Sequence, residues 1–213
     1  MNSIEAAQVK WIKDNAPYLI MAGGGRSVQV LLHDTYTGAA GNAHNTTADS
    51  GQTRTTVRGQ VNLDGDGQLI WADDGGSTDP SDVQYGAVAA DITIHLRGVT
   101  IPVGSGIHIH FNSDATLENG WSVNMADANS LNIVMIVGGV QIIKASSSGS
   151  LTNGTNCFLT VVVRGDTITA TGSDGDTTET VTYTVVNRGN KTQDIIGLSV
   201  GRDTKISDLS ATI

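Results

Sequence analysis

Two stretches decide the fold class: LNIVMIVGGVQIIKA (residues 131–145) and CFLTVVVRGDTITATGSDGDTTETVTYTV (residues 157–185). In the second stretch, Thr180, Thr182 and Thr184 alternate with apolar residues. This period of two is typical of a strand with one solvated face and one buried face. The pattern therefore indicates β-structure rather than helix.

The same stretches predict how their strands are covered and connected. Residues 159–163 and 168–170 are apolar runs on either side of residues 164–166, which read Arg-Gly-Asp. Two strands joined by a short glycine turn are the expected result. Residues 131–137 are apolar at nearly every position and rich in β-branched side chains, so we expect a strand covered on both faces.

The remainder of the main fold consists of further short apolar runs separated by Gly, Asn, Asp, Ser and Thr. One long loop is expected at residues 73–81. The expected strands are 28–32, 57–61, 68–71, 87–96, 107–111, 120–125, 195–200 and 206–213. Many short strands with one terminal helix predict an all-β antiparallel sandwich over residues 28–213.

Residues 1–27 are expected to form an arm outside the sandwich. A helix is predicted from Ser3 to Asn15, ended by Pro17, and three glycines at 23–25 form a hinge. The helix carries an apolar stripe that includes the residues Ile4, Trp11 and Ile12. The stripe either folds back on the sheet or docks on a partner or a second copy.

Composition excludes several classes of function. The net charge is −9 and the isoelectric point about 4.7, and the twelve Lys and Arg residues are scattered, so nucleic-acid binding is not expected. Cys157 is the single cysteine, which excludes an intrachain disulfide and favours a small buried side chain. Charged residues near the N-terminus predict no signal peptide and no membrane span, hence a chain made in a cytosol.

A resemblance to a known family rests on several short motifs. Asp34-Thr35-Tyr36-Thr37-Gly38, His44 and Asp49-Ser50-Gly51 resemble the opening of a laminin-G-like, concanavalin A-type jelly roll, as found in phage and bacterial structural proteins. The central strand, the paired strands around the glycine turn and the closing strands are similar too; these are Gly120–Val123, Leu159–Thr169, Ile196–Val200 and Ile206–Leu209. Arg54 departs from the family, which tends to carry Trp there. The resemblance implies a jelly-roll sandwich with a short N-terminal helical arm.

Glycoside hydrolases of this type carry Glu-x-Asp-x-x-Glu on one strand, where two carboxylates supply a nucleophile and a general acid. The chain has glutamate only at Glu5, Glu118 and Glu179. The nearest match, Asp174 to Glu179, contains glycine between two alternating strands and is interpreted as a hairpin turn. No Ser-His-Asp set and no phosphate-binding glycine loop is placed by the sequence, so no enzyme is predicted.

Two metal sites are conceivable from ligand spacing. Asn62, Asp64, Asp66 and Asp73 follow the alternating rhythm of a calcium loop, although an Asp/Gly hairpin explains the same letters. His108 and His110 lie on one strand face, and His95 on a preceding strand is a candidate third ligand for zinc or nickel. Solvent-facing histidines beside buried Ile residues are the alternative. No cofactor is predicted beyond this calcium candidate.

For a carbohydrate site, exposed aromatic rings must stack on sugar faces. Trp71, Tyr85 and Trp121 are the candidates, with packing in the core as the alternative.

The resemblance and the missing catalytic set favour a non-enzymatic bacteriophage virion protein, a capsid decoration or tail component. It would join other virion proteins through its arm as a homo-oligomer, with a trimer favoured. A carbohydrate-binding module for surface attachment is the alternative, and a glycoside hydrolase ranks last.

Overall fold

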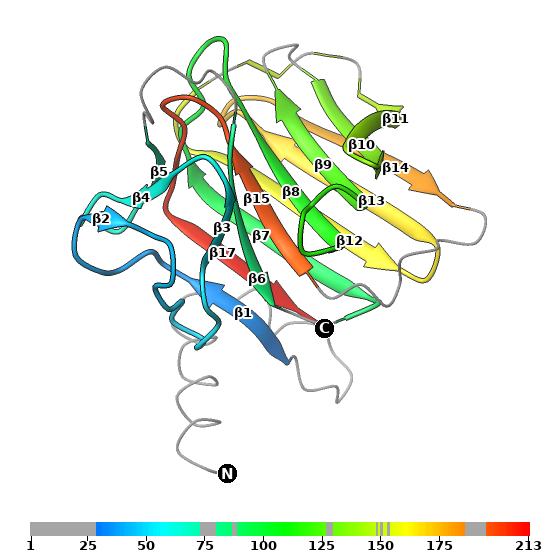
Figure 1. Cartoon of the computed structure of the whole chain (residues 1–213). Helices are drawn as coiled ribbons and strands as arrows, with labels where there is room; N and C mark the ends of the chain where they lie inside the picture. Colours follow the sequence, from blue (N-terminus) through cyan, green and yellow to red (C-terminus); the bar gives the residue numbers. More distant parts are fainter. Residues whose placement is uncertain are drawn as a thin grey trace.

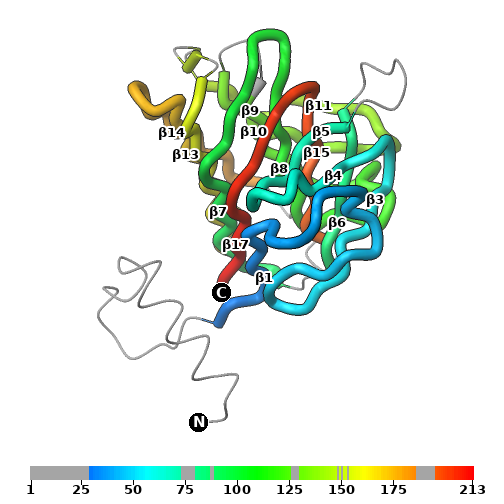
Figure 2. The backbone as a smooth tube through the Cα atoms, turned by 90° about the vertical axis from the view of Figure 1, so that its left-hand side faces the viewer, coloured from blue at the N-terminus to red at the C-terminus, as the bar shows by residue number. Residues whose placement is uncertain are grey.

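Two antiparallel sheets form the body of the molecule, packed face to face (Figures 1 and 2). The structure is a computed structural model that describes residues 29–72, 80–86, 89–126, 130–147, 149, 151–152, 154–185 and 195–213. The first sheet has six strands in the order β1 (Val30–Asp34), β17 (Asp208–Thr212), β7 (Ile92–Val99), β12 (Cys157–Arg164), β13 (Thr167–Ser173) and β14 (Thr178–Thr184).

The second sheet has seven strands and lies nearer the viewer in Figure 1. Its order is β11 (Val140–Ser146), β10 (Ser130–Val137), β9 (Gly120–Ala126), β8 (Gly106–Ser113), β15 (Ile195–Val200), β6 (Ser81–Gly86) and β3 (Thr55–Arg58). A small third sheet joins β16 (Lys205–Ile206), β5 (Leu69–Trp71), β4 (Val61–Leu63) and β2 (Gly41–Asn42). The predicted all-β antiparallel sandwich is confirmed, and the described residues contain no helix.

The hairpins expected from the deciding stretches are present. Strands β12 and β13 pair from Arg164↔Thr167 outward and are joined by Gly165 and Asp166. Strand β14 pairs with β13, and its threonines face solvent while the alternate residues face inward. The Asp174 side chain closes the intervening turn by accepting hydrogen bonds from the backbone N–H groups of Asp176 and Thr177. The interpretation of residues 174–179 as a hairpin is therefore confirmed.

Strand β10 has both faces covered along most of its length. Leu131 and Ile133 lie in the core, and Val134 and Ile136 are buried on the other face, whereas Val137 at the end is exposed. Cys157 is a free, buried thiol, as predicted.

Three strand predictions were wrong. The expected strand at 57–61 spans a break at residues 59–60, between β3 of the seven-stranded sheet and β4 of the small third sheet. Strand β6 (Ser81–Gly86) was not predicted, because Asp82 and Gln84 make its outer face polar and a turn-rich segment precedes it. Strand β7 begins at Ile92 rather than at residue 87. The Asp91 carboxylate accepts a hydrogen bond from the N–H of Gly165 (2.8 Å), which places Asp91 at the turn between strands.

The predicted arm over residues 1–27, with Ile4, Trp11 and Ile12, lies outside the described residues. The described part of the chain contains no helix long and apolar enough to cross a membrane.

A buried ion pair joins the last residue of β1 to the residue just before β3. Arg54 and Asp34 are 1% and 0% exposed, and the Arg54 Nε donates to Asp34 Oδ2 over 2.6 Å while Nη2 donates to Oδ1. Arg54 Nη1 donates to Thr46 Oγ1 (2.8 Å), and the guanidinium lies 5.8 Å from the centre of the Tyr36 ring. Arg54 therefore serves as the buried ion-pair partner of Asp34. The family that the sequence resembles tends to carry Trp at this position.

We expect Arg54→Ala to lower the free energy of unfolding by about 3–5 kcal/mol, because it leaves the Asp34 carboxylate buried without a counter-charge. Urea unfolding followed by circular dichroism measures the change. Arg54→Lys is the matched variant, which keeps the charge but loses the two-pronged geometry and is expected to lose less. A loss below 1 kcal/mol in Arg54→Ala would contradict this account.

Candidate functional site

The outer face of the seven-stranded sheet carries a row of polar side chains that crosses neighbouring strands. Arg58 of β3 pairs with Asp82 of β6, which pairs with Ser199 of β15, which pairs with His108 of β8. Residues at alternate positions point to the same face of a sheet, so His110 lies on this face beside His108. Their inward-facing neighbours on β8 belong to the core.

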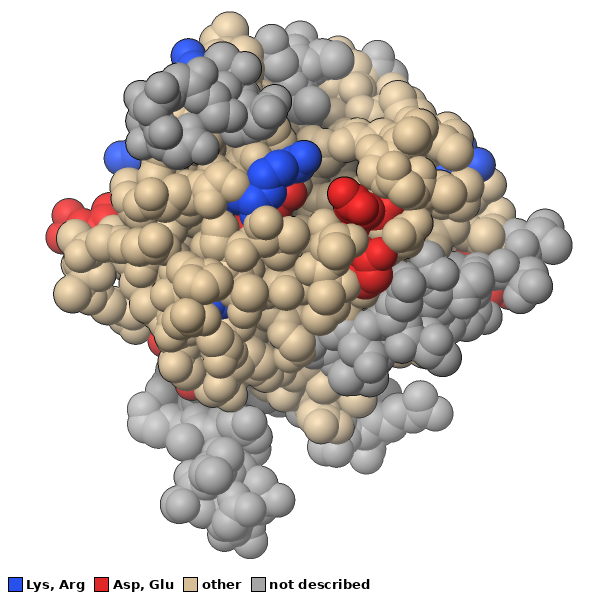
Figure 3. All heavy atoms as spheres, viewed as in Figure 1, with Lys and Arg blue, Asp and Glu red and all other residues tan. Residues whose placement is uncertain are grey.

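A hollow of about 370 Å³ opens over this row, and we call it the seven-strand hollow. Figure 3 shows the same face, hollowed between a basic group and acidic groups. The loop between β8 and β9 forms one wall, and β11 with the turn before it forms another. The lining residues are Val57, Arg58, Pro80, Asp82, His108, His110, Thr116, Leu117, Glu118, Ile136, Gly139, Gln141 and Ser199.

The wall formed by the β8–β9 loop is held in place by one carboxylate. Asp114 Oδ1 accepts hydrogen bonds from the N–H groups of Thr116 (3.2 Å) and Glu118 (3.1 Å), and Oδ2 accepts one from Asn119 Nδ2 (2.7 Å). Leu117 of this loop is buried against Gly197 of β15, where an added Cβ would lie 2.8 Å from the leucine methyl carbons. Glu118 is therefore presented at the rim by an ordered loop.

The floor of the hollow is a connected set of polar groups. His110 Nε2 and Ser199 Oγ lie 2.7 Å apart, and Arg58 Nη2 donates to Asp82 Oδ2 over 2.8 Å. Burial raises the pKa of the Asp82 carboxyl, against the opposing effect of hydrogen bonds from Ser199 and Arg58. Burial lowers the pKa of His108 to about 4 and that of His110 to about 3, so both imidazoles are neutral at pH 7.

Two buried atoms on this floor have no hydrogen-bond partner within the described part of the chain: Asp82 Oδ1 and His110 Nδ1. An unpaired buried polar atom costs about 1–3 kcal/mol. Both atoms belong to residues that line the hollow but are buried beneath its surface, so a ligand seated there would reach them only after the side chains turn toward it.

A serine, a histidine and an aspartate meet on this floor, although the sequence did not place such a set. In a catalytic triad the histidine lies between the aspartate and the serine. Here Ser199 lies between Asp82 and His110. No carboxylate therefore orients the imidazole, and the arrangement lacks the geometry that activates a serine nucleophile.

The three aromatic residues that were candidates for stacking on sugars are core residues. Trp71, Tyr85 and Trp121 are 9%, 0% and 3% exposed, and all three belong to the hydrophobic core. Their rings have no open face for a ligand, so their burial supports a role in core packing rather than in sugar binding. The reason is their position in each strand, which points them inward.

The predicted histidine cluster divides between the two faces of the sandwich. His108 and His110 lie together on β8 with ring centres 6.1 Å apart, whereas His95 lies on β7 in the other sheet. His95 was only a candidate third ligand, and it is not a neighbour of the pair, because the consecutive strands β7 and β8 belong to different sheets.

The calcium loop is only partly described. Asp64 Oδ1 accepts hydrogen bonds from the N–H groups of Asp66 (2.8 Å) and Gln68 (3.0 Å). These bonds close a turn, as expected of the Asp/Gly hairpin that was the alternative to a calcium loop. Asn62 lies on β4 and accepts a hydrogen bond from Gln60, and Asp73 is outside the described residues. The residues that the structure describes contain no group of three or more His, Cys, Asp or Glu side chains able to hold a metal ion. Calcium binding at this loop stays a prediction.

Sequence comparison with protein-family models and with characterised proteins finds no match. Among solved structures, the chain is similar to the carbohydrate-binding module CBM66 from Bacillus subtilis, with 18% identity, a TM-score of 0.54, and coverage of 72% of this chain and 90% of that one. It is also similar to the calcium- and mannose-bound exoplasmic domain of VIP36 (12%, 0.59, 87% and 91%) and to winged bean acidic lectin with methyl-α-D-galactose (10%, 0.57, 87% and 98%). At these identities the likeness shows the fold alone, which is that of jelly-roll lectins and carbohydrate-binding modules.

The buried histidines predict a specific pH dependence of stability. Between pH 6.5 and about 4 the unfolded chain binds protons at His108 and His110 that the folded protein does not, so acidification through this range lowers the free energy of unfolding. The slope is up to about 1.4 kcal/mol per pH unit for each histidine. Asp174 does not contribute to this slope. Its pKa is lowered to about 2, chiefly by the hydrogen bond from Thr177 N–H, so the stability that the ionised Asp174 carboxylate contributes to the fold is lost only below about pH 4.

Urea unfolding at pH 7.5, 6.5, 5.5 and 4.5 measures this slope. His110→Gln is expected to flatten it, and Asp174→Asn is the control that leaves the slope between pH 6.5 and 4.5 unchanged. Equal stability at pH 7.5 and 4.5 in the unmodified protein would contradict the prediction.

Proposed function

We propose that this chain is a non-catalytic carbohydrate-binding module and that the seven-strand hollow holds a neutral sugar. The observation that carries the proposal is the pair of unpartnered atoms on the floor, Asp82 Oδ1 and His110 Nδ1. A polar hollow of about 370 Å³ is within the size range of small-molecule sites.

The hydrogen-bonding roles on the floor favour a ligand with many hydroxyl groups. An ionised Asp82 accepts from Arg58 through Oδ2. In the tautomer in which His110 Nε2–H donates to Ser199 Oγ, the Nδ1 atom of His110 is an acceptor. Asp82 Oδ1 and Glu118 are further acceptors, so the hollow needs donors, and sugar hydroxyl groups are donors in a compact arrangement.

The charge of the hollow favours a neutral ligand over an anionic one. Among its described lining residues, Arg58 is the single cation, and it is paired with Asp82. Glu118 adds a second carboxylate, and the whole chain carries a net charge of −9. An anion placed here would be repelled.

The similar folds support this proposal without identifying the sugar. The similar VIP36 domain and winged bean lectin were solved with mannose and with methyl-α-D-galactose bound, respectively. The order Asp82, Ser199, His110 supports a role in binding rather than in hydrolysis, which also agrees with the absence of the two-glutamate catalytic motif from the sequence.

We expect the purified chain to bind a neutral oligosaccharide on a glycan array, and Asp82→Asn and Glu118→Gln to weaken that binding at least tenfold. A hydrogen bond to a charged group contributes about 1.5–3 kcal/mol, and about 1.4 kcal/mol corresponds to a factor of ten. Isothermal titration calorimetry with the best array ligand measures the change.

The matched control is Asp176→Asn, the same chemical change in the exposed turn between β13 and β14. It is expected to bind like the unmodified protein. Unaltered affinity in Asp82→Asn, or no neutral glycan bound on the array, would exclude this site.

A virion role supplements this proposal and rests on the sequence resemblance. In it, the arm docks the module on other virion proteins or on further copies of the chain, with a trimer favoured, and the sandwich is displayed outward. Deleting residues 1–27 is expected to reduce the mass in solution from oligomer to monomer with no change in melting temperature, measured by light scattering and calorimetry. An unchanged mass, or an unfolded product, would contradict the docking role of the arm.

A further inference from the structure

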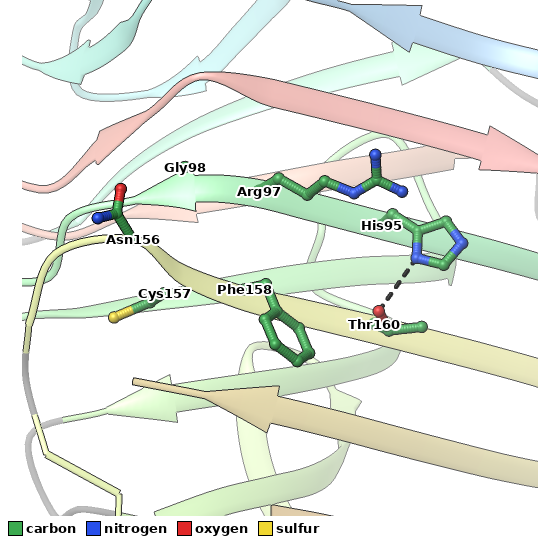
Figure 4. Close-up of a pocket in the computed structure, with 7 residues that line it drawn as sticks. All are labelled: His95, Arg97, Gly98, Asn156, Cys157, Phe158 and Thr160. Atoms are coloured by element: carbon green, nitrogen blue, oxygen red, sulfur yellow. Dashed lines mark hydrogen bonds between the residues drawn. The ribbon is translucent and has the colours of Figure 1, made fainter. Parts of the chain in front are cut away.

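A second hollow lies on the opposite face of the sandwich, over β7 and β12 of the six-stranded sheet. Its volume is about 450 Å³, and we call it the bulge hollow. Figure 4 shows His95 and Arg97 coming from β7 and Phe158 and Thr160 from β12. The remaining lining residues are Gly98, Asn156 and Cys157.

A β-bulge creates this hollow. Cys157 pairs with Val99 and Leu159 pairs with Leu96, so two residues of β7, Arg97 and Gly98, face Phe158 alone. Bulges redirect side chains and are frequent beside functional sites. Gly98 has φ +58° and lies so close to Ser207 that an added Cβ would be 2.8 Å from the serine Cβ. The irregularity therefore requires glycine at this position.

Phe158 gives the bulge hollow an aromatic surface. Among the described Trp, Tyr and Phe residues, it is the one ring that neither belongs to the hydrophobic core nor packs against it. The side chain is partly exposed and lies beside exposed Asn156. An aromatic ring next to polar groups is suited to a ligand with one flat apolar face and a polar edge.

The bulge hollow differs from the seven-strand hollow in the charged groups that line it. Arg97 is its cation, and none of the described residues that line it is a carboxylate. Asp208 of β17 faces Arg97 across the strand pair, but a guanidinium has five N–H donors and can serve a second acceptor. His95 is held by Thr160 (Nδ1 to Oγ1, 3.0 Å), and burial lowers its pKa to about 4, so it is neutral at pH 7.

We propose that the bulge hollow is a second ligand site that binds a carboxylate-bearing sugar, a uronic acid, with its ring face on Phe158 and its carboxylate on Arg97. Arginine matches the two oxygens of a carboxylate with two parallel N–H groups. Asn156 and His95 lie at opposite ends of the hollow, on either side of Phe158 (Figure 4). This site is independent of the neutral-sugar site on the other face.

Titration of the full chain with a galacturonic acid trisaccharide, and with the neutral galactose trisaccharide, tests the proposal by calorimetry. The acidic ligand is expected to bind, and Phe158→Leu and Arg97→Gln are each expected to weaken it at least tenfold. Phe158→Leu keeps an apolar side chain of similar size, so it tests the ring rather than the fold. The neutral ligand is expected not to depend on Phe158 or Arg97.

Asp82→Asn, in the other hollow, is the matched control and is expected to leave uronic-acid affinity unchanged. Unaltered affinity in Phe158→Leu, loss of affinity in Asp82→Asn, or no binding of the acidic ligand would each overturn the proposal. Because the two hollows have separate variants and separate ligands, failure of one site is distinguishable from failure of the other.

Discussion

The buried contact between Asp34 and Arg54 is the constraint on which the rest of the structure depends. It joins residues 20 positions apart in a region of very low exposure, where each charge without the other would be strongly destabilising. Asp34 also accepts the N–H of Tyr36 (2.9 Å), which holds Tyr36 at φ 56°. Tyr36 is a core residue, as is Tyr85 of β6 in the other sheet, so the ion pair positions a ring that packs between the two sheets.

Once the two sheets are fixed face to face, alternation along each strand decides which residues are free for function. On β8, Ile107 and Ile109 enter the core while His108 and His110 face outward. Core packing restricts the residue types at the inward positions. The outward polar residues contribute little to the core. This division explains why the aromatic rings at inward positions serve stability, and why the polar groups of the candidate site lie at the alternate positions.

Local patterns in the sequence were sufficient to predict the sandwich, the hairpin after Arg164 and the turn at Asp174, because these depend on residues close together in the chain. The candidate site was not predictable in the same way. His110 and Ser199 are 89 positions apart, and Asp82 lies on the strand that was not predicted. Which strands become neighbours depends on packing between distant segments, so alternation predicted strands but did not predict that β7 and β8 separate His95 from His108.

Both hollows form where a glycine replaces a side chain within a strand. Gly197 leaves room for Leu117, which brings the β8–β9 loop and Glu118 over the seven-stranded sheet. Gly98 permits the bulge that separates Arg97 from its regular partner on β12. Glycine inside a strand weakens the strand and marks close approach of other groups, so a stable sandwich retains it only where packing or function requires the space. The two hollows therefore both lie at interruptions of regular strand pairing.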